Sequence, residues 1–297
     1  MAESVQKVPL APVQVCFIVN NVEEAVRFSE EHFGWGPFHT FSAPVENAKY
    51  KDWTGFKHVD VALGSGGNVQ IEYVHVREGK DTIALYEEKY GTGIQHFGVQ
   101  TPDRDAAIDY ITSLGGEEDA RDEFPGVRFA FMNIPTGQGM FELLQPEQSA
   151  NSIVDQANAV KAGGAGSEKH VLKVDRATVV TGNMEETLAF YSQCFDWVDV
   201  KAEAQTLKSG DREVKLKRCI AFAGAMEIEL IEATPEGTDP YSLHRRRGEH
   251  GIVHVSTSVA PVSEALLPSY EGEWLETGEA FALYEWLGGN NSLQVRR

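Results

Sequence analysis

Two stretches of the chain repeat one pattern of apolar and polar positions. Residues 16–35 (CFIVNNVEEAVRFSEEHFGW) and 178–197 (TVVTGNMEETLAFYSQCFDW) each begin with an apolar, β-branched run and continue with helical periodicity. The positions that share one helix face in the first stretch are Val22, Ala25, Val26, Ser29 and Phe33. The pattern predicts a strand, a turn and an amphipathic helix in each stretch.

The two stretches belong to a longer internal repeat. They are related by a constant offset of 178 − 16 = 162 residues, which matches Asn21 with Asn183 and Trp35 with Trp197. Further matches follow in the same order along the chain: 68–75 with 226–233, 90–99 with 247–256, and 140–145 with 291–296. A repeat that keeps its order and spacing predicts two copies of one folding unit.

Each unit is itself doubled. Residues 13–76 are predicted to form a strand, a helix and several strands, and residues 94–146 repeat that order. The helix expected at 103–113 has Asp103 or Asp105 near its start and Gly115-Gly116 after its end, as is normal for capping. The sequence therefore predicts an α+β fold of four βαβββ modules in two tandem domains. The expected boundaries are 10–147 for the N-terminal domain, 148–172 for a linker rich in small residues, and 173–297 for the C-terminal domain.

Composition narrows the choice of partners. The chain has 26 Lys and Arg against 45 Asp and Glu, a net charge of −19, which disfavours nucleic acid and anionic membranes. Three cysteines without a Cys-x-x-Cys pair predict neither a disulfide framework nor a cysteine zinc site. Without a leader-like or membrane-spanning apolar run, we expect a cytoplasmic protein that binds a small-molecule substrate, as a monomer or homodimer.

Four polar residues stand at equivalent places in the modules of the first unit. They open or close apolar strands and are Gln14, Glu72, His96 and Glu142. Each shares a strand face with apolar neighbours, because side chains alternate along a strand. Two carboxylates on an apolar face are costly unless a cation compensates them. A divalent metal held by these oxygen and nitrogen atoms would supply that cation, although solvent-facing glutamates and a packed core histidine remain the alternative.

The order of these segments resembles the vicinal oxygen chelate superfamily, which includes glyoxalase I, methylmalonyl-CoA epimerase and extradiol dioxygenases. The segments that carry the resemblance are QVCFIVNNVEEAVRFSEEHFGWGPF, GTGIQHFGVQTPD and FELLQP. The resemblance implies two tandem glyoxalase/dioxygenase-fold domains and places the metal ligands at Gln14, Glu72, His96 and Glu142. This set is similar to the zinc ligands of animal-type glyoxalase I and departs from the set common in the epimerases. It implies one divalent metal ion, with zinc as the first choice and manganese, nickel, cobalt or iron as alternatives.

The second unit offers a different set at the corresponding places. Its residues are Arg176, Glu229, His254 and Gln294. Arginine is permanently charged and has no acceptor atom, so Arg176 cannot bind a cation. We expect a degenerate site in which Arg176 pairs with Glu229 or binds an anionic group. A degenerate second site also speaks against a two-domain extradiol dioxygenase, whose iron lies in the C-terminal domain.

The resemblance implies a metal-dependent isomerase or lyase, glyoxalase-like or epimerase-like. Such an enzyme moves a proton next to a carbonyl of a small oxygenated substrate through an enediolate or enolate stabilised by the metal. Glu142, with Glu72 opposite, is the expected catalytic base. Two alternatives stay open: an iron(II)-dependent dioxygenase, which one histidine supports poorly, and a non-catalytic small-molecule binding protein without metal.

Overall fold

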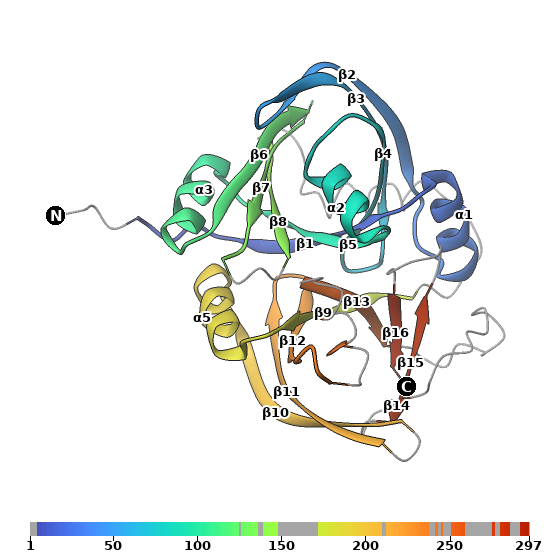
Figure 1. The fold of residues 1–297 in the computed structure, drawn as a ribbon, viewed down its shortest axis with the longest axis vertical. Helices are drawn as coiled ribbons and strands as arrows, with labels where there is room; N and C mark the ends of the chain where they lie inside the picture. The colour runs from blue at the N-terminus through green and yellow to red at the C-terminus, as the bar shows by residue number, and fades with distance from the viewer. Residues whose placement is uncertain are drawn as a thin grey trace.

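The chain folds into two β-sheets, one from each half of the sequence. The computed structural model describes residues 5–124, 126–135, 139–147, 172–209, 212–237, 241–242, 245, 251–258, 275–276, 280–285 and 292–296. Each sheet contains eight strands, and Figure 1 shows the two sheets stacked, with α1, α3 and α5 at their outer edges. The α+β prediction with tandem domains is confirmed.

The first sheet is built from two βαβββ modules. Its strands run in the order β2-β3-β4-β1-β5-β8-β7-β6. β1 is parallel to β4, β5 is parallel to β8, and the antiparallel pair of β1 and β5 joins the modules at the centre. The elements of this half are β1 (Ala11–Ile18), α1 (Val22–His32), β2 (His39–Tyr50), β3 (Trp53–Ser65), β4 (Gln70–Glu78), α2 (Thr82–Tyr90), β5 (Gly93–Gln100), α3 (Arg104–Ser113), β6 (Glu117–Phe124), β7 (Val127–Asn133) and β8 (Met140–Pro146).

The second sheet repeats this topology. Its order is β10-β11-β12-β9-β13-β16-β15-β14, and it closes on itself because β14 pairs with β10. The elements are β9 (Val174–Thr181), α5 (Met184–Cys194), β10 (Val198–Ser209), β11 (Arg212–Ala223), β12 (Met226–Glu232), β13 (Gly251–Ser258), β14 (Leu275–Glu276), β15 (Ala280–Glu285) and β16 (Ser292–Arg296). The helix implied for the fourth module falls within 259–274, outside the described residues. The linker prediction lies outside them too, apart from Leu172, so the domain boundaries stay a prediction.

The repeated asparagines have a structural reason. Asn21 and Asn183 are the N-caps of α1 and α5, and each side chain accepts a hydrogen bond from a backbone N–H three residues on, at 3.1 and 3.2 Å. Asp103 caps α3 in the same way, with Ala106 N at 3.0 Å, as the sequence predicts. Such a cap satisfies one of the backbone donors that a helix start leaves unpaired.

Helix α2 was not expected from the sequence. It connects the two modules of the first half, is capped by Asp81 and ends at Gly91, whose φ of 79° favours glycine. Its Ile83 packs in a buried apolar cluster with Cys16 and Met140. The helix therefore covers one face of the first sheet (Figure 1), which we call the inner face.

The two halves share a continuous core on the opposite side. The ring of Phe141 on β8 lies 5.7 Å from that of Tyr191 on α5, within one buried cluster that draws on both sheets. Trp35 Nε1 donates to the carbonyl of Leu172 at 2.6 Å, and the Tyr110 hydroxyl donates to that of Gln193 at 2.8 Å. These contacts hold the halves together and leave the inner face of the first sheet for other chemistry.

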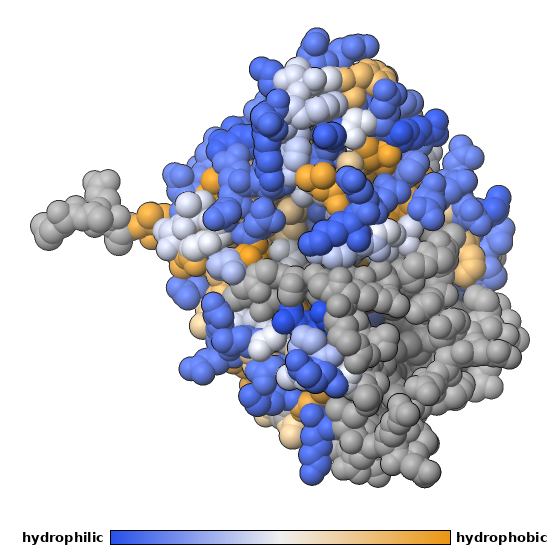
Figure 2. Space-filling view, in the orientation of Figure 1, coloured by the Kyte–Doolittle hydropathy of each residue, from blue (hydrophilic) through white to orange (hydrophobic). Residues whose placement is uncertain are grey.

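Hydrophilic side chains cover most of the described surface in the view of Figure 2, with apolar patches between them on the first half. Within the described part of the chain, no helix has the length and apolar character needed to span a bilayer.

Candidate metal centre

Polar side chains form two neighbouring rows across the inner face of the first sheet. In the first row Cys16 on β1 stands opposite Glu72 on β4 and His96 on β5. In the second row Gln14 on β1 stands opposite Gly98 on β5, and Gly98 in turn pairs with Glu142 on β8. Strand alternation places both rows on the same face, because Gln14 and Cys16 are two residues apart, as are His96 and Gly98.

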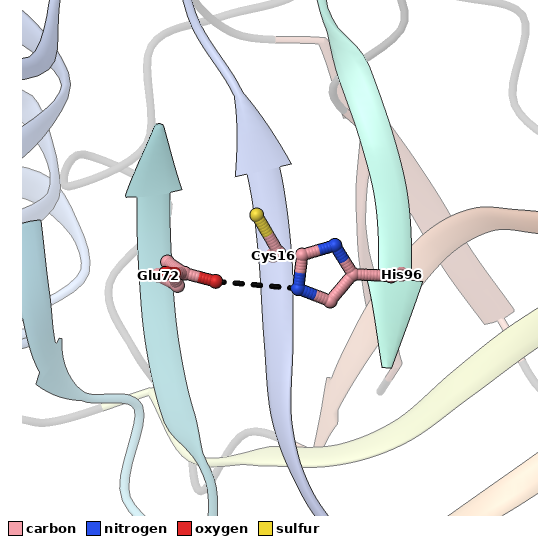
Figure 3. A group of neighbouring side chains, drawn as sticks. All are labelled: Cys16, Glu72 and His96. Carbon is pink, nitrogen blue, oxygen red and sulfur yellow. Dashed lines mark ion pairs between the residues drawn. The ribbon is translucent and has the colours of Figure 1, made fainter. Parts of the chain in front are cut away.

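Two carboxylates converge on one imidazole at this place. His96 Nε2 lies 3.3 Å from Glu72 Oε2 and 3.4 Å from Glu142 Oε2. His96 is fully buried, and the side chains of Glu72 and Glu142 are only 13% and 10% exposed. The structure thus brings together three of the four predicted ligands. Figure 3 shows Glu72 and His96 facing each other, with the sulfur of Cys16 beside them.

The converging atoms lack hydrogen bonds. His96 Nε2, Glu72 Oε2 and Gln14 Oε1 are buried and none has a hydrogen-bond partner. Buried polar atoms of native proteins are nearly always satisfied, so three such atoms on one face call for an explanation. A bound cation would satisfy them, since each atom carries a lone pair suited to a metal.

The other nitrogen of the imidazole is held in place. His96 Nδ1 bonds Gln95 Oε1, and Gln95 Nε2 contacts Met140 Sδ at 3.3 Å, which turns the amide oxygen toward the ring. In the neutral imidazole, donation through Nδ1 leaves Nε2 as the acceptor, the arrangement typical of metal-binding histidines.

The charges at the centre do not balance. Burial and the neighbouring Glu72 raise the pKa of Glu142 above its usual value. Burial opposes the charged form of His96, but Glu142 and Glu72 outweigh it and raise the pKa of the imidazole to about 9. Burial and the same two carboxylates raise the pKa of the Cys16 thiol. One imidazolium facing two carboxylates leaves a net negative charge, so the residues present fit a divalent cation.

Gln14 lies one row away from His96. Its Nε2 donates to Gln70 Oε1 at 2.6 Å, while its Oε1 lies above Gly98. A Cβ added at Gly98 would come within 2.2 Å of that oxygen, so only glycine leaves room for this amide. Glu142 belongs to the same row as Gln14, and its side chain reaches His96. The role of Gln14 as a ligand stays a prediction.

Cys16 is also a member of the cluster, although the sequence predicted no cysteine zinc site. Its Sγ, a carboxylate oxygen of Glu72 and a ring nitrogen of His96 lie within 4.8 Å of one another. The signal was present in the strand alternation, which puts Cys16 on the same face as Gln14. The resemblance, however, placed the metal ligand of this strand at Gln14.

The second sheet repeats the framework of the site. Thr178 on β9 stands opposite Glu229 on β12 and His254 on β13, as Cys16 stands opposite Glu72 and His96. Gln294 on β16 pairs with Ser256, the counterpart of Gly98, so it takes the place of Glu142 in the register. The equivalences predicted between the two units therefore hold at the level of strand pairing.

Arginines supply the positive charge of the second site. Arg218 Nε donates to Glu229 Oε1, and Arg176 lies 3.6 Å from the same carboxylate while bonding Glu227 at 2.7 Å. Burial favours the neutral form of Glu229, but Arg218, Arg176, the Thr178 hydroxyl and His254 outweigh it and hold its pKa below the usual value. The predicted pairing of Arg176 with Glu229 is present, whereas the role of Arg218 was not predicted.

A separate cavity of about 700 Å³ lies beside the start of α1, with Ser42, Asp60 and His75 in its lining. Ser42 Oγ lies 2.6 Å from His58 Nε2 but donates its hydrogen to Asp60 at 2.7 Å. A serine nucleophile would have to give that hydrogen to the histidine. The arrangement therefore does not form a hydrolase triad.

Tandem sheets of paired βαβββ modules, with a carboxylate–imidazole cluster on one inner face, define a chelate-type fold with a candidate metal centre. Residues 13–131 match the model of the Glyoxalase/Bleomycin resistance protein/Dioxygenase superfamily. The resemblance identified from the sequence is confirmed.

Solved structures support the same fold over the whole chain. A triple mutant of 4-hydroxymandelate synthase from Streptomyces coelicolor is 14% identical, with 98% of this chain and 93% of that chain covered and a TM-score of 0.61. A hypothetical protein from Staphylococcus aureus is 12% identical, with 96% and 99% covered and a TM-score of 0.52. At these identities the likeness concerns the fold alone. No curated protein matches the sequence significantly.

Proposed function

We propose that the protein is a metal-dependent isomerase or lyase that moves a proton next to a carbonyl of a small oxygenated substrate. One observation carries the proposal: the buried carboxylates of Glu72 and Glu142 converge on His96 Nε2, which has no hydrogen-bond partner. Among the described residues, no arginine or lysine pairs with either carboxylate. The match of residues 13–131 to the model of a superfamily that includes such enzymes supports it.

The residues that would hold the metal are Glu72, His96 and Glu142, with the amide oxygen of Gln14 as the predicted fourth ligand. Zinc is the expected ion, and manganese, nickel, cobalt or iron would also suit oxygen and imidazole ligands. A divalent ion, when bound, supplies Lewis acidity that stabilises negative charge developing on a carbonyl oxygen.

The chain itself supplies the proton transfer. Burial and Glu72 raise the pKa of Glu142, which makes its carboxylate a stronger base than an exposed glutamate. Glu142 would take the proton from the carbon next to the carbonyl and return it to the same or the neighbouring carbon. Glu72, on the opposite side of His96, is placed to serve the other face of the substrate.

Apolar side chains wall the centre. Phe131 presents its ring to the His96 imidazole edge-on at 5.3 Å, and Met140 and Val61 lie in the same buried cluster. Ile83 places α2 against that cluster. Such a wall excludes water and strengthens the interaction of a bound substrate with the charged groups.

We expect protein purified without chelators to contain about one divalent ion per chain, because only the first site lacks its own cationic side chains. Elemental analysis would measure this. His96→Ala should lower the metal content strongly, whereas its counterpart His254→Ala should leave it unchanged. Unchanged metal in His96→Ala, or no metal after reconstitution with zinc, would overturn the metal centre.

The reaction class can be tested without a known substrate. Small 2-oxo and 2-hydroxy carbonyl compounds would be incubated with the metal-loaded protein in deuterated water and followed by NMR. Proton transfer predicts deuterium at the carbon next to the carbonyl in at least one compound class. Iron with substrate-dependent oxygen uptake would favour a dioxygenase, and a tightly bound molecule in a metal-free protein would favour a binding protein.

A further inference from the structure

Cys16 occupies a singular place among the three cysteines. It is fully buried and stands in strand register between Glu72 on one side and His96 on the other. The other two, Cys194 and Cys219, belong to the apolar cluster that joins the two halves. In Figure 3 the Cys16 sulfur lies beside the contact between Glu72 and His96.

The geometry of the three donors is compact. Cys16 Sγ, a Glu72 oxygen and a His96 nitrogen all lie within 4.8 Å of one another. Ligands that share one zinc ion at about 2.0 to 2.3 Å must lie within roughly twice that distance of one another. The buried Glu72 Oε2 and His96 Nε2, which make no hydrogen bond, are a second and independent sign that something binds between them.

The second sheet has a different residue at the position that corresponds to Cys16. The counterpart of Cys16 is Thr178, whose hydroxyl donates a hydrogen bond to Glu229. A thiol is a much weaker hydrogen-bond donor than a hydroxyl, but a thiolate is a strong ligand for zinc. The first site therefore has a residue able to bind a metal where the second site has the better hydrogen-bond donor.

We propose that the Cys16 thiolate is a ligand of the same divalent ion that Glu72 and His96 hold, an inference that rests on the metal centre of the proposed function. On binding, the S–H bond breaks, the proton leaves to solvent and the sulfur lone pair forms the bond to the metal. A sulfur ligand favours zinc, cobalt or cadmium over manganese and magnesium, so Cys16 determines which metal the site selects.

The test uses the full-length chain reconstituted with cobalt(II). A sulfur ligand gives a sulfur-to-cobalt charge-transfer band in the near ultraviolet. We expect this band in the unmodified protein, its loss in Cys16→Ser, and its retention in Cys219→Ser. Zinc affinity should fall in Cys16→Ser by more than the roughly 10- to 100-fold that loss of an outer-sphere partner costs.

A second measurement needs no substitution. X-ray absorption of the zinc-loaded protein should show one sulfur scatterer at about 2.3 Å. Cobalt bound without the charge-transfer band, or a band that survives in Cys16→Ser, would overturn the sulfur ligand and leave the metal centre standing. A chain that binds neither cobalt nor zinc would overturn both.

Discussion

Replacing Arg218 with valine should lower the free energy of unfolding by about 3 kcal/mol, because it leaves the buried Glu229 without its nearest cation. Valine is chosen because Val61 is the counterpart of Arg218 in the first sheet. Arg218 pairs with Ile231, two residues beyond Glu229. Val61 pairs with Val74, two residues beyond Glu72. The loss stays near the low end of the range for broken buried pairs, since Arg176 remains 3.6 Å away.

The effect of Arg218→Val has a definite pH dependence. In the unmodified protein the pKa of Glu229 is lowered, so its pairing stabilises the fold above the ordinary glutamate pKa of about 4.3. That contribution is lost as the pH falls through the lowered value. In the variant the loss of Arg218 makes the pKa of Glu229 higher than in the parent. The destabilisation is therefore full at high pH and shrinks as the pH falls and the carboxyl is protonated.

Denaturant titrations at several pH values would measure both results. Arg121→Val is the matched control, because Arg121 pairs with Glu118 but its side chain is 47% exposed, and it should cost less than about 1 kcal/mol. Removing Glu229 as well, in Arg218→Val with Glu229→Leu, should restore most of the lost stability. A variant as stable as the parent at neutral pH would show that Arg218 does not compensate Glu229.

The two halves thus differ in how the charge of a buried glutamate is compensated. Both sheets bury a glutamate beside a histidine at the same register position. In the second sheet arginine side chains neutralise the carboxylate. In the first sheet valine and glutamine stand at the two arginine places, and the described residues supply only His96 against two carboxylates. The comparison within one chain supports a metal in the first site and none in the second.

Much of this architecture could be predicted from the sequence. Strand alternation indicates which side chains share a face, and the internal repeat indicates the order of the modules. The module order and the meeting of Glu72, His96 and Glu142 follow from periodicity and repeated position. Helix α2 could not be predicted in this way, since its buried residues Thr82 and Ile83 lie at one end and make no apolar stripe.

Two site residues also escaped prediction for physical reasons. Arg218 on β11 is paired directly with Ile231 on β12 and reaches Glu229, two residues away on β12, by a diagonal contact. No pattern within a single strand predicts a diagonal contact with its neighbour. Cys16 shares its face with Gln14, so alternation alone allows either residue to serve the centre. Only the strand register, which pairs Cys16 with both Glu72 and His96, distinguishes the two.

Glu142→Gln should have opposite effects on catalysis and on the stability of the metal-free protein. The amide cannot accept the substrate proton, so the rate of deuterium exchange should fall by about 10²- to 10⁴-fold. Burial and Glu72 raise the pKa of Glu142, which means that its ionised form is disfavoured in the folded chain. A neutral amide of the same shape removes that cost, so the metal-free variant should unfold at a higher temperature at neutral pH than the metal-free parent.

Bound metal should act against this difference in unfolding temperature between the parent and Glu142→Gln. The ion compensates both carboxylates of the parent and is bound less tightly by an amide, so metal should raise the unfolding temperature of the parent more than that of Glu142→Gln. Thermal unfolding of both chains with and without zinc measures this difference. Glu88→Gln is the control, because Glu88 is exposed on α2 and should change neither quantity. Full exchange activity in Glu142→Gln would remove it as the base. A metal-free variant less stable than its parent would show that Glu142 carries no uncompensated charge.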